Sequence, residues 1–105
     1  MTEFLHVGVP TTIKQPNENY ASDLKVYITN PEEHEFKFEY LRFEPDTPLP
    51  EIMQKNPHVA YKVDCLDDKI KDEKVIVEPF SVDENTKIAF IIKEGVIFEL
   101  MEVNE

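Results

Sequence analysis

The sequence predicts a small α+β protein in which strands dominate and the chain consists of two similar halves. Apolar and polar residues alternate in several short runs, which is the pattern of strands with one buried face. The two glycines and eight prolines fall mostly between these runs and leave room only for short helices. Two short motifs of the first half recur in the same order in the second half, which indicates a duplicated module.

The first half is predicted to hold strands separated by proline-containing loops. Its predicted strands are Phe4–Val9, Leu24–Thr29 and Glu35–Phe43. Between the first two, Pro10 and Pro16 interrupt the chain, and at most a short helical turn fits around Asn17–Ser22. The segment Glu44–Pro57 contains four prolines, with room for one helical turn at Glu51–Lys55. Such a segment is expected to link the two modules.

The second half repeats this pattern with longer strands and one short helix. Its predicted strands are His58–Val63, Lys74–Glu78, Lys87–Lys93 and Val96–Val103, which brings the total to about seven. Asp64–Lys71 fits a helix, with Asp64 as its N-cap and with Leu66 and Ile70 at helical spacing. Glu94-Gly95 predicts a tight hairpin between the last two strands.

Chain length and net charge limit the number of domains and the kinds of binding partner that we expect. A chain of 105 residues fits a single domain over residues 1–105, with module one at about 1–50 and module two at about 51–105. The net charge of −11 disfavours nucleic acid and membrane surfaces as partners. Arg42 is the single arginine and Cys65 the single cysteine, and the N-terminus lacks the pattern of a signal peptide. A cytoplasmic protein without disulfides is expected.

The internal repeat places the same residue types at matching positions of both halves. The motif His6-Val7-Gly8-Val9 recurs as His58-Val59-Ala60-Tyr61, and Phe38-Glu39-Tyr40-Leu41 recurs as Phe98-Glu99-Leu100-Met101. Each half therefore begins with a strand that carries histidine and ends with one that carries glutamate. Two matches of this length can also arise by coincidence.

The repeated histidines and glutamates point to a metal site. Because strand side chains alternate between faces, these four side chains project away from strongly apolar faces. Brought together, His6, Glu39, His58 and Glu99 would form a two-histidine, two-glutamate set. Such donors suit one divalent ion of zinc, nickel, cobalt, manganese or iron. Taken singly, each histidine fits better as a solvent-facing or hydrogen-bonded residue, and each glutamate as part of the polar face of its strand.

The segment of about residues 57–103 (PHVAYKVDCLDDKIK…VIVEPF…IAFIIKEGVIFELME) resembles the second half of a vicinal-oxygen-chelate protein of the glyoxalase, bleomycin-resistance and dioxygenase superfamily. FLHVGVP and FEYLRFEPDTPLP are similar to that family's opening strand and to its glutamate-bearing strand with the linker. The resemblance implies paired βαβββ modules that form a partly open, barrel-like sheet, with His6, Glu39, His58 and Glu99 as metal ligands. TTIKQPNENYAS stands where the first module's helix is expected, so that module is abbreviated and one of its strands is hard to place.

This resemblance implies a metal-dependent lyase or isomerase that acts on a small carbonyl compound. The metal would act as a Lewis acid that stabilises an enediolate. Either a metal-bound hydroxide or a displaced ligand, with Glu99 as the first candidate, would serve as the catalytic base. One alternative is a non-catalytic protein of the same fold that binds or sequesters a small molecule. A further alternative is an extradiol-type dioxygenase, which uses two histidines and one carboxylate on iron. Glutathione and coenzyme A substrates are disfavoured for lack of a cationic cluster, and the apolar strands allow a homodimer.

Overall fold

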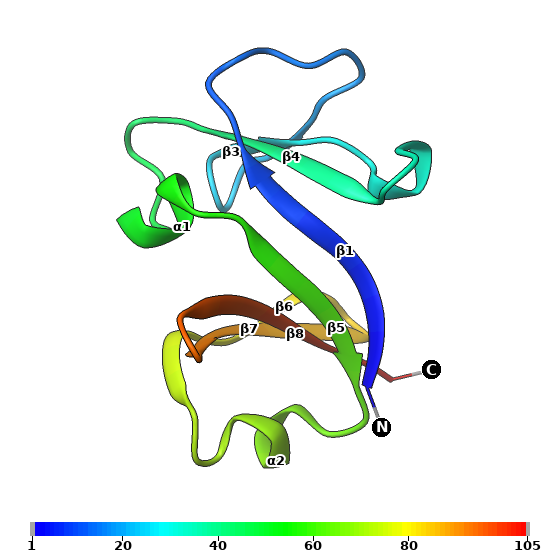
Figure 1. The fold of residues 1–105 in the computed structure, drawn as a ribbon, viewed down its shortest axis with the longest axis vertical. Helices are drawn as coiled ribbons and strands as arrows, with labels where there is room; N and C mark the ends of the chain where they lie inside the picture. The colour runs from blue at the N-terminus through cyan, green and yellow to red at the C-terminus, as the bar shows by residue number, and fades with distance from the viewer. Residues whose placement is uncertain (1, 105) are drawn as a thin grey trace. The chain divides into compact units, whose positions relative to one another are not determined.

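Residues 2–104 are described by a computed structural model, in which the chain divides into two compact units. The N-terminal unit comprises residues 6–57, and the C-terminal unit comprises residues 2–5 together with 58–104. The elements can be followed along the chain in Figure 1. They are β1 (Thr2–Pro10), β2 (Asn19–Ala21), β3 (Val26–Ile28), the 3-10 helix η1 (Pro31–Glu33), β4 (Phe38–Phe43), α1 (Glu51–Lys55), β5 (His58–Val63), α2 (Leu66–Ile70), β6 (Lys74–Asp83), β7 (Thr86–Lys93) and β8 (Val96–Val103).

The C-terminal unit is a sheet of β5, β8, β7 and β6, in that order. The first strand β5 pairs in parallel with the last strand β8, while β8–β7 and β7–β6 are antiparallel. Glu94 and Gly95 connect β7 to β8 with φ angles of 55° and 80°. Positive φ at both central residues is the geometry of a two-residue hairpin turn that matches the twist of the strands. The predicted hairpin is confirmed.

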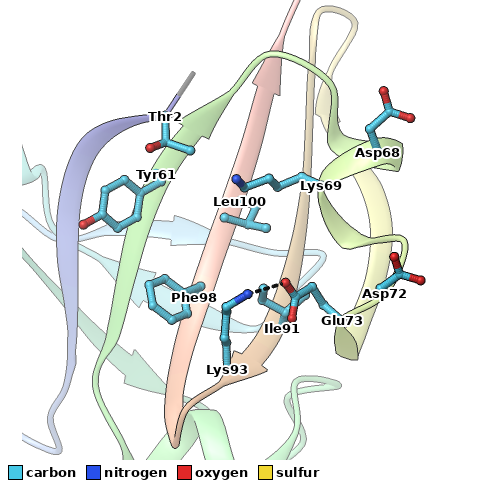
Figure 2. Close-up of a pocket in the computed structure, with 10 residues that line it drawn as sticks. All are labelled: Thr2, Tyr61, Asp68, Lys69, Asp72, Glu73, Ile91, Lys93, Phe98 and Leu100. Atoms are coloured by element: carbon cyan, nitrogen blue, oxygen red, sulfur yellow. Dashed lines mark hydrogen bonds and ion pairs between the residues drawn. The ribbon is translucent and has the colours of Figure 1, made fainter.

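Helix α2 packs against part of one face of this sheet and contributes Leu66 to the core of the unit. Leu66 of α2, which is 0% exposed, packs with Val63, Ala89, Ile91 and Leu100. Figure 2 shows Ile91 and Leu100 on this face, beside α2. Burial of aliphatic side chains is worth about 1.5–3 kcal/mol each, so this cluster holds the helix to the strands.

The prediction that Asp64 is the N-cap of α2 is wrong. The cap residue is Cys65, and its side chain makes no capping hydrogen bond. A residue from β8 serves instead, because the Glu102 carboxylate accepts the Leu66 backbone N–H at 2.7 Å. This hydrogen bond, followed by one from Asn104, holds the pKa of Glu102 below its usual value. The sequence could not reveal this cap because the two residues are far apart in the chain.

The N-terminal unit repeats the strand order of the C-terminal unit. Its strands run β1, β4, β3 and β2 across the sheet, with β1 parallel to β4 and with β4–β3 and β3–β2 antiparallel. In both units the first strand thus lies beside the last, and the remaining two follow in reverse order. Where the C-terminal module has α2, the N-terminal module has an irregular segment of residues 11–18. The α+β class and the abbreviated first module are confirmed.

The structure of Asn17–Ser22 differs from the short helical turn that the sequence analysis allowed there. This segment does not form a helical turn, because Asn19–Ala21 forms strand β2. Tyr20 lies opposite Tyr27 of β3, and their ring centroids are 4.7 Å apart. Pairing with β3 satisfies the backbone groups of a short polar segment that has no apolar helical face. This strand is the one that the sequence left unplaced, and it raises the total among the described residues to eight.

Other boundaries shift by a few residues. Lys25 and Lys37 have positive φ angles of 51° and 59°, so β3 and β4 begin after them rather than at Leu24 and Glu35. Strand β6 continues to Asp83, well beyond its predicted end, because its pairing with β7 continues to Thr86. The short helix Glu51–Lys55 is confirmed as α1. No helix in the described chain is long and apolar enough to cross a membrane.

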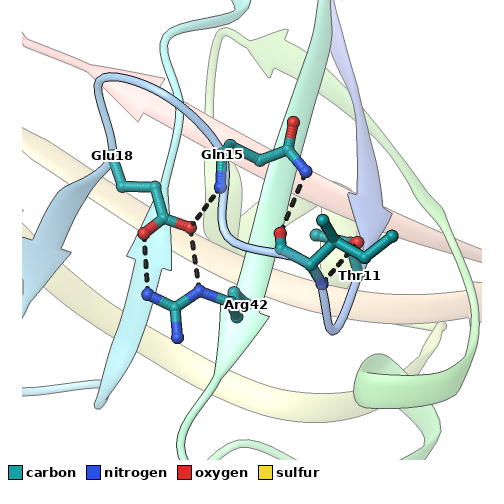
Figure 3. Close-up of polar contacts among 5 residues, drawn as sticks. Thr11, Gln15, Glu18 and Arg42 are labelled. Carbon is teal, nitrogen blue, oxygen red and sulfur yellow. Dashed lines mark hydrogen bonds and ion pairs between the residues drawn. The ribbon is translucent and has the colours of Figure 1, made fainter.

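An ion pair anchors the irregular segment of the N-terminal unit. The Arg42 guanidinium donates two hydrogen bonds to the Glu18 carboxylate, at 2.9 and 2.7 Å, and Glu18 also accepts the backbone N–H of Gln15. Figure 3 shows this arrangement. Arg42 also lies over the Tyr27 ring, 4.1 Å from its centroid. The bond from Arg42 is the main cause that lowers the pKa of Glu18 to about 2.

Lowering the pH should therefore remove the stability that the Glu18–Arg42 ion pair contributes to the folded chain. A Glu18→Gln variant, which lacks this pair, should not show that loss of stability. A carboxyl whose pKa is depressed in the folded chain stabilises it above the ordinary value of 4.5, and that contribution is lost as the pH falls toward about 2. The difference in urea midpoint between the native chain and Glu18→Gln should be largest above pH 5 and should shrink between pH 4.5 and 2. A difference that stays constant over this range would contradict the assignment. Glu35→Gln, at an exposed position, is the control.

Candidate functional site

A buried histidine–glutamate pair lies in the sheet of the C-terminal unit. His58 at the start of β5 is 1% exposed, and Glu99 in β8 is 6% exposed. The His58 Nε2 and Glu99 Oε1 atoms are 3.0 Å apart. Burying an imidazole and a carboxylate costs free energy unless each has a polar or charged partner. The fold therefore keeps these two side chains close to each other and shielded from water.

Strand pairing explains why these two side chains meet. Ala60 lies directly opposite Glu99 in the parallel ladder, and His58 lies two residues before Ala60. Residues two apart in a strand share a face, so the imidazole and the carboxylate project from the same side of the sheet. Ala60, which lies on the same face beside Glu99, has a small side chain.

Phe90 of β7 completes the surroundings of this pair. It lies directly opposite Glu99 in the antiparallel ladder, and its ring meets the His58 ring edge-on at 5.4 Å and 89°. The sequence analysis missed this residue. The signal was present, because a two-residue turn at Glu94-Gly95 fixes the register of the hairpin and places Phe90 opposite Glu99.

A second histidine–glutamate pair lies in the N-terminal unit. His6 of β1 is 6% exposed, and its Nε2 atom is 3.4 Å from Oε1 of Glu39 in β4. Gly8 lies opposite Glu39 in the parallel ladder, two residues after His6. Each predicted ligand is thus found beside one other predicted ligand from its own unit.

The two pairs occupy equivalent positions in the two modules. In each module the histidine lies on the first strand, two residues before a small residue, and that residue is opposite the glutamate of the last strand. Gly8 and Ala60 are the small residues. Chance sequence matches would not be expected to acquire the same strand pairing and the same register. The internal repeat is therefore a structural repeat.

The chemistry of these donors fits a divalent transition metal. The pair His6–Glu39 and the pair His58–Glu99 each bring together an imidazole and a carboxylate, and these donors suit such an ion. A cation would also offset the cost of burying negative charge on the glutamates. Calcium or magnesium would instead favour sites made of oxygen ligands.

The third histidine takes part in neither pair. His34 stacks on Phe38 at 4.7 Å with an interplanar angle of 6°, and its Nδ1 atom accepts the backbone N–H of Phe36. These contacts order the turn that precedes β4. His34 is therefore a useful control for experiments on the two pairs.

Fold and paired residues together define a protein of two topologically equivalent strand modules, each with one histidine–glutamate pair. Solved structures with a similar fold include the following two. The hypothetical protein BH1468 from Bacillus halodurans C-125 has a TM-score of 0.72 and 21% sequence identity, over 99% of this chain and 96% of that chain. Methylmalonyl-CoA epimerase from Mycobacterium tuberculosis has a TM-score of 0.55 and 16% identity, over 97% and 88% of the two chains. No protein-family model and no curated protein matches the sequence. At these sequence identities the similarity shows a common fold and nothing beyond it.

Proposed function

We propose that the chain is a glyoxalase-like metalloprotein in which His6, Glu39, His58 and Glu99 together hold one divalent ion. The observation that carries this proposal is the equivalent register of the two histidine–glutamate pairs. Each pair supplies half of a tetradentate donor set, so a duplicated module accounts for the whole set. The expected ion is zinc, nickel, cobalt, manganese or iron, since imidazole and carboxylate suit all five.

The reaction class that fits best is a lyase or isomerase reaction that begins with removal of a proton next to a carbonyl group. A bound divalent ion supplies Lewis-acid charge to neighbouring oxygens of the substrate. Glu99 is the residue proposed to accept the proton, because it is a buried carboxylate. His58, whose Nε2 atom is 3.0 Å from Glu99 Oε1, would position that carboxylate. The edge of the Phe90 ring restricts rotation of the His58 imidazole.

A small carbonyl compound is the proposed substrate, rather than a conjugate of coenzyme A or glutathione. Recognition of phosphates or multiple carboxylates generally relies on arginine. Arg42 is the single arginine of the chain, and its guanidinium is held by Glu18 and stacked over Tyr27. The proposed substrate is therefore of a different class from the coenzyme A thioester for which the mycobacterial epimerase is named.

One structural difference between the modules favours a second candidate function. Residues 11–18 of the N-terminal module form no helix where the C-terminal module has α2. An abbreviated module is compatible with a non-catalytic protein of the same fold that sequesters a small molecule. Such a protein needs no metal, whereas the lyase or isomerase does.

Proton exchange in deuterated water tests the catalytic proposal directly. The chain loaded with zinc, nickel, cobalt or manganese should catalyse exchange of the α-proton of 2-hydroxypropanal or dihydroxyacetone, measured by proton NMR. Glu99→Gln should reduce that exchange by roughly 10²–10⁴-fold, the usual contribution of a general base. Glu94→Gln, in the exposed hairpin turn, should leave the rate unchanged. Metal-loaded protein that exchanges no faster than free metal would reject catalysis on this substrate class and favour the sequestering alternative.

A further inference from the structure

A pocket of about 510 Å³ opens on the α2 face of the C-terminal sheet. Its lining comes from β5, β7 and β8, from α2 with the turn that follows it, and from the start of β1 (Figure 2). Volumes of 300–1,000 Å³ are typical of sites for small molecules. The pocket lies on the face opposite the histidine–glutamate pair, because Phe98 and Leu100 alternate with Glu99 along β8. It is thus separate from the candidate metal ligands.

The pocket exists because α2 is too short to cover the sheet. Five helical residues extend about 7.5 Å, whereas an eight-residue strand such as β8 extends about 27 Å. The part of the sheet near Tyr61 and Phe98 therefore lies beyond the helix. These two rings are half-buried, with centroids 6.1 Å apart, and together with buried Ile91 and Leu100 they form an apolar floor.

The charged side chains around this floor differ in what they can offer a ligand. Lys93 is neutralised by Glu73, with Nζ and Oε2 2.8 Å apart. Figure 2 shows that Asp68 and Asp72 direct their carboxylates away from the pocket, while the Lys69 side chain extends over Leu100. Within the described chain, no carboxylate forms an ion pair with Lys69. Lys69 is therefore the cation that can act as counter-ion for a ligand on the apolar floor.

We propose that this pocket binds a small monocarboxylate with an aliphatic or aromatic body. The apolar part would lie on Tyr61, Phe98 and Leu100, and the carboxylate would accept a hydrogen bond from the Lys69 ammonium. Amines are disfavoured, because the one carboxylate that faces inward, that of Glu73, is already engaged by Lys93. The proposal concerns a binding site and does not depend on metal binding by the histidine–glutamate pairs.

Charge reversal at Lys69 tests the proposal on the intact chain. Octanoate, octanol and octylammonium would be titrated separately into the ¹⁵N-labelled protein, below the concentrations at which they aggregate, and amide shifts would be followed by NMR. In the native chain octanoate should bind most tightly and should shift the amides of Tyr61, Ile91 and Phe98. Lys69→Glu should weaken octanoate binding roughly fivefold or more and should make octylammonium the tighter ligand. Lys71 directly follows α2 and is not among the residues that line the pocket. Lys71→Glu should therefore leave octanoate as the tightest of the three ligands.

Two results would overturn the proposal. Octanoate and octanol that bind equally well to the native chain would show that Lys69 does not select the ligand. Shifts confined to residues outside the pocket would show that the ligands bind elsewhere. Spectra of both variants without ligand establish that each remains folded, so that a loss of octanoate binding can be assigned to charge.

Discussion

Replacing His58 by alanine is expected to abolish tight binding of a divalent metal and the rise in unfolding temperature that the metal produces. A ligand at one hundred times its dissociation constant stabilises a folded chain by about 2.7 kcal/mol. For a protein of about 100 residues that corresponds to a shift on the order of 10 °C or more. The loss of one of four proposed ligands, from a side chain that is 1% exposed, should eliminate most of this shift.

The measurement compares each variant with and without metal. Removing His58 also leaves the buried Glu99 carboxylate without a neighbour that the native fold provides, so the metal-free variant is expected to unfold at a lower temperature. The change in unfolding temperature on adding zinc, nickel or manganese, together with the metal content of protein purified without a histidine tag, separates this cost from metal binding. His34→Ala is the matched control and should retain the metal.

His6→Ala extends the same experiment to the other module. If both pairs serve one ion, this variant should lose the metal as completely as His58→Ala does. Metal binding that survives His6→Ala but not His58→Ala would restrict the site to the C-terminal pair. Unchanged binding in both variants would reject the proposed ligands altogether.

Leu66→Ala is expected to cost about 2–5 kcal/mol in the free energy of unfolding, the usual range for truncating a fully buried leucine. Leu66 is 0% exposed and is the α2 residue that packs into the cluster of Val63, Ala89, Ile91 and Leu100. Small domains have only about 5–15 kcal/mol of net stability, so this single change can remove a large part of it. Urea denaturation of the native and variant chains measures the difference.

Two further variants make this result interpretable. Cys65→Ala, at the exposed position next to Leu66, should change the unfolding free energy by no more than about 0.5 kcal/mol. Leu66→Met, which preserves most of the volume, should cost less than about 1.5 kcal/mol. A loss below 1 kcal/mol for Leu66→Ala would mean that α2 is not held to the sheet by this side chain.

The alternation of apolar and polar residues was enough to predict the strongly patterned strands, and the internal repeat was enough to find the residues that recur in both modules. β5 and β8 were predicted with their observed bounds, because His58 to Val63 and Val96 to Val103 lie between clear turn or breaker residues. The Glu94-Gly95 turn was predictable because glycine tolerates positive φ and here separates two strongly apolar strands. The histidines and glutamates were identified by their repeated spacing, which needs no knowledge of the tertiary fold.

Features that depend on partners distant in the chain could be seen only in the folded protein. β2 has no strand pattern of its own and exists because β3 supplies its hydrogen bonds. Glu102 rather than Asp64 satisfies the start of α2, since the carboxylate of β8 reaches the Leu66 amide. The pairing of His58 with Glu99, and of His6 with Glu39, follows from the register of parallel strands. A sequence specifies which face each side chain occupies, but long-range strand pairing decides which side chains share that face at contact distance.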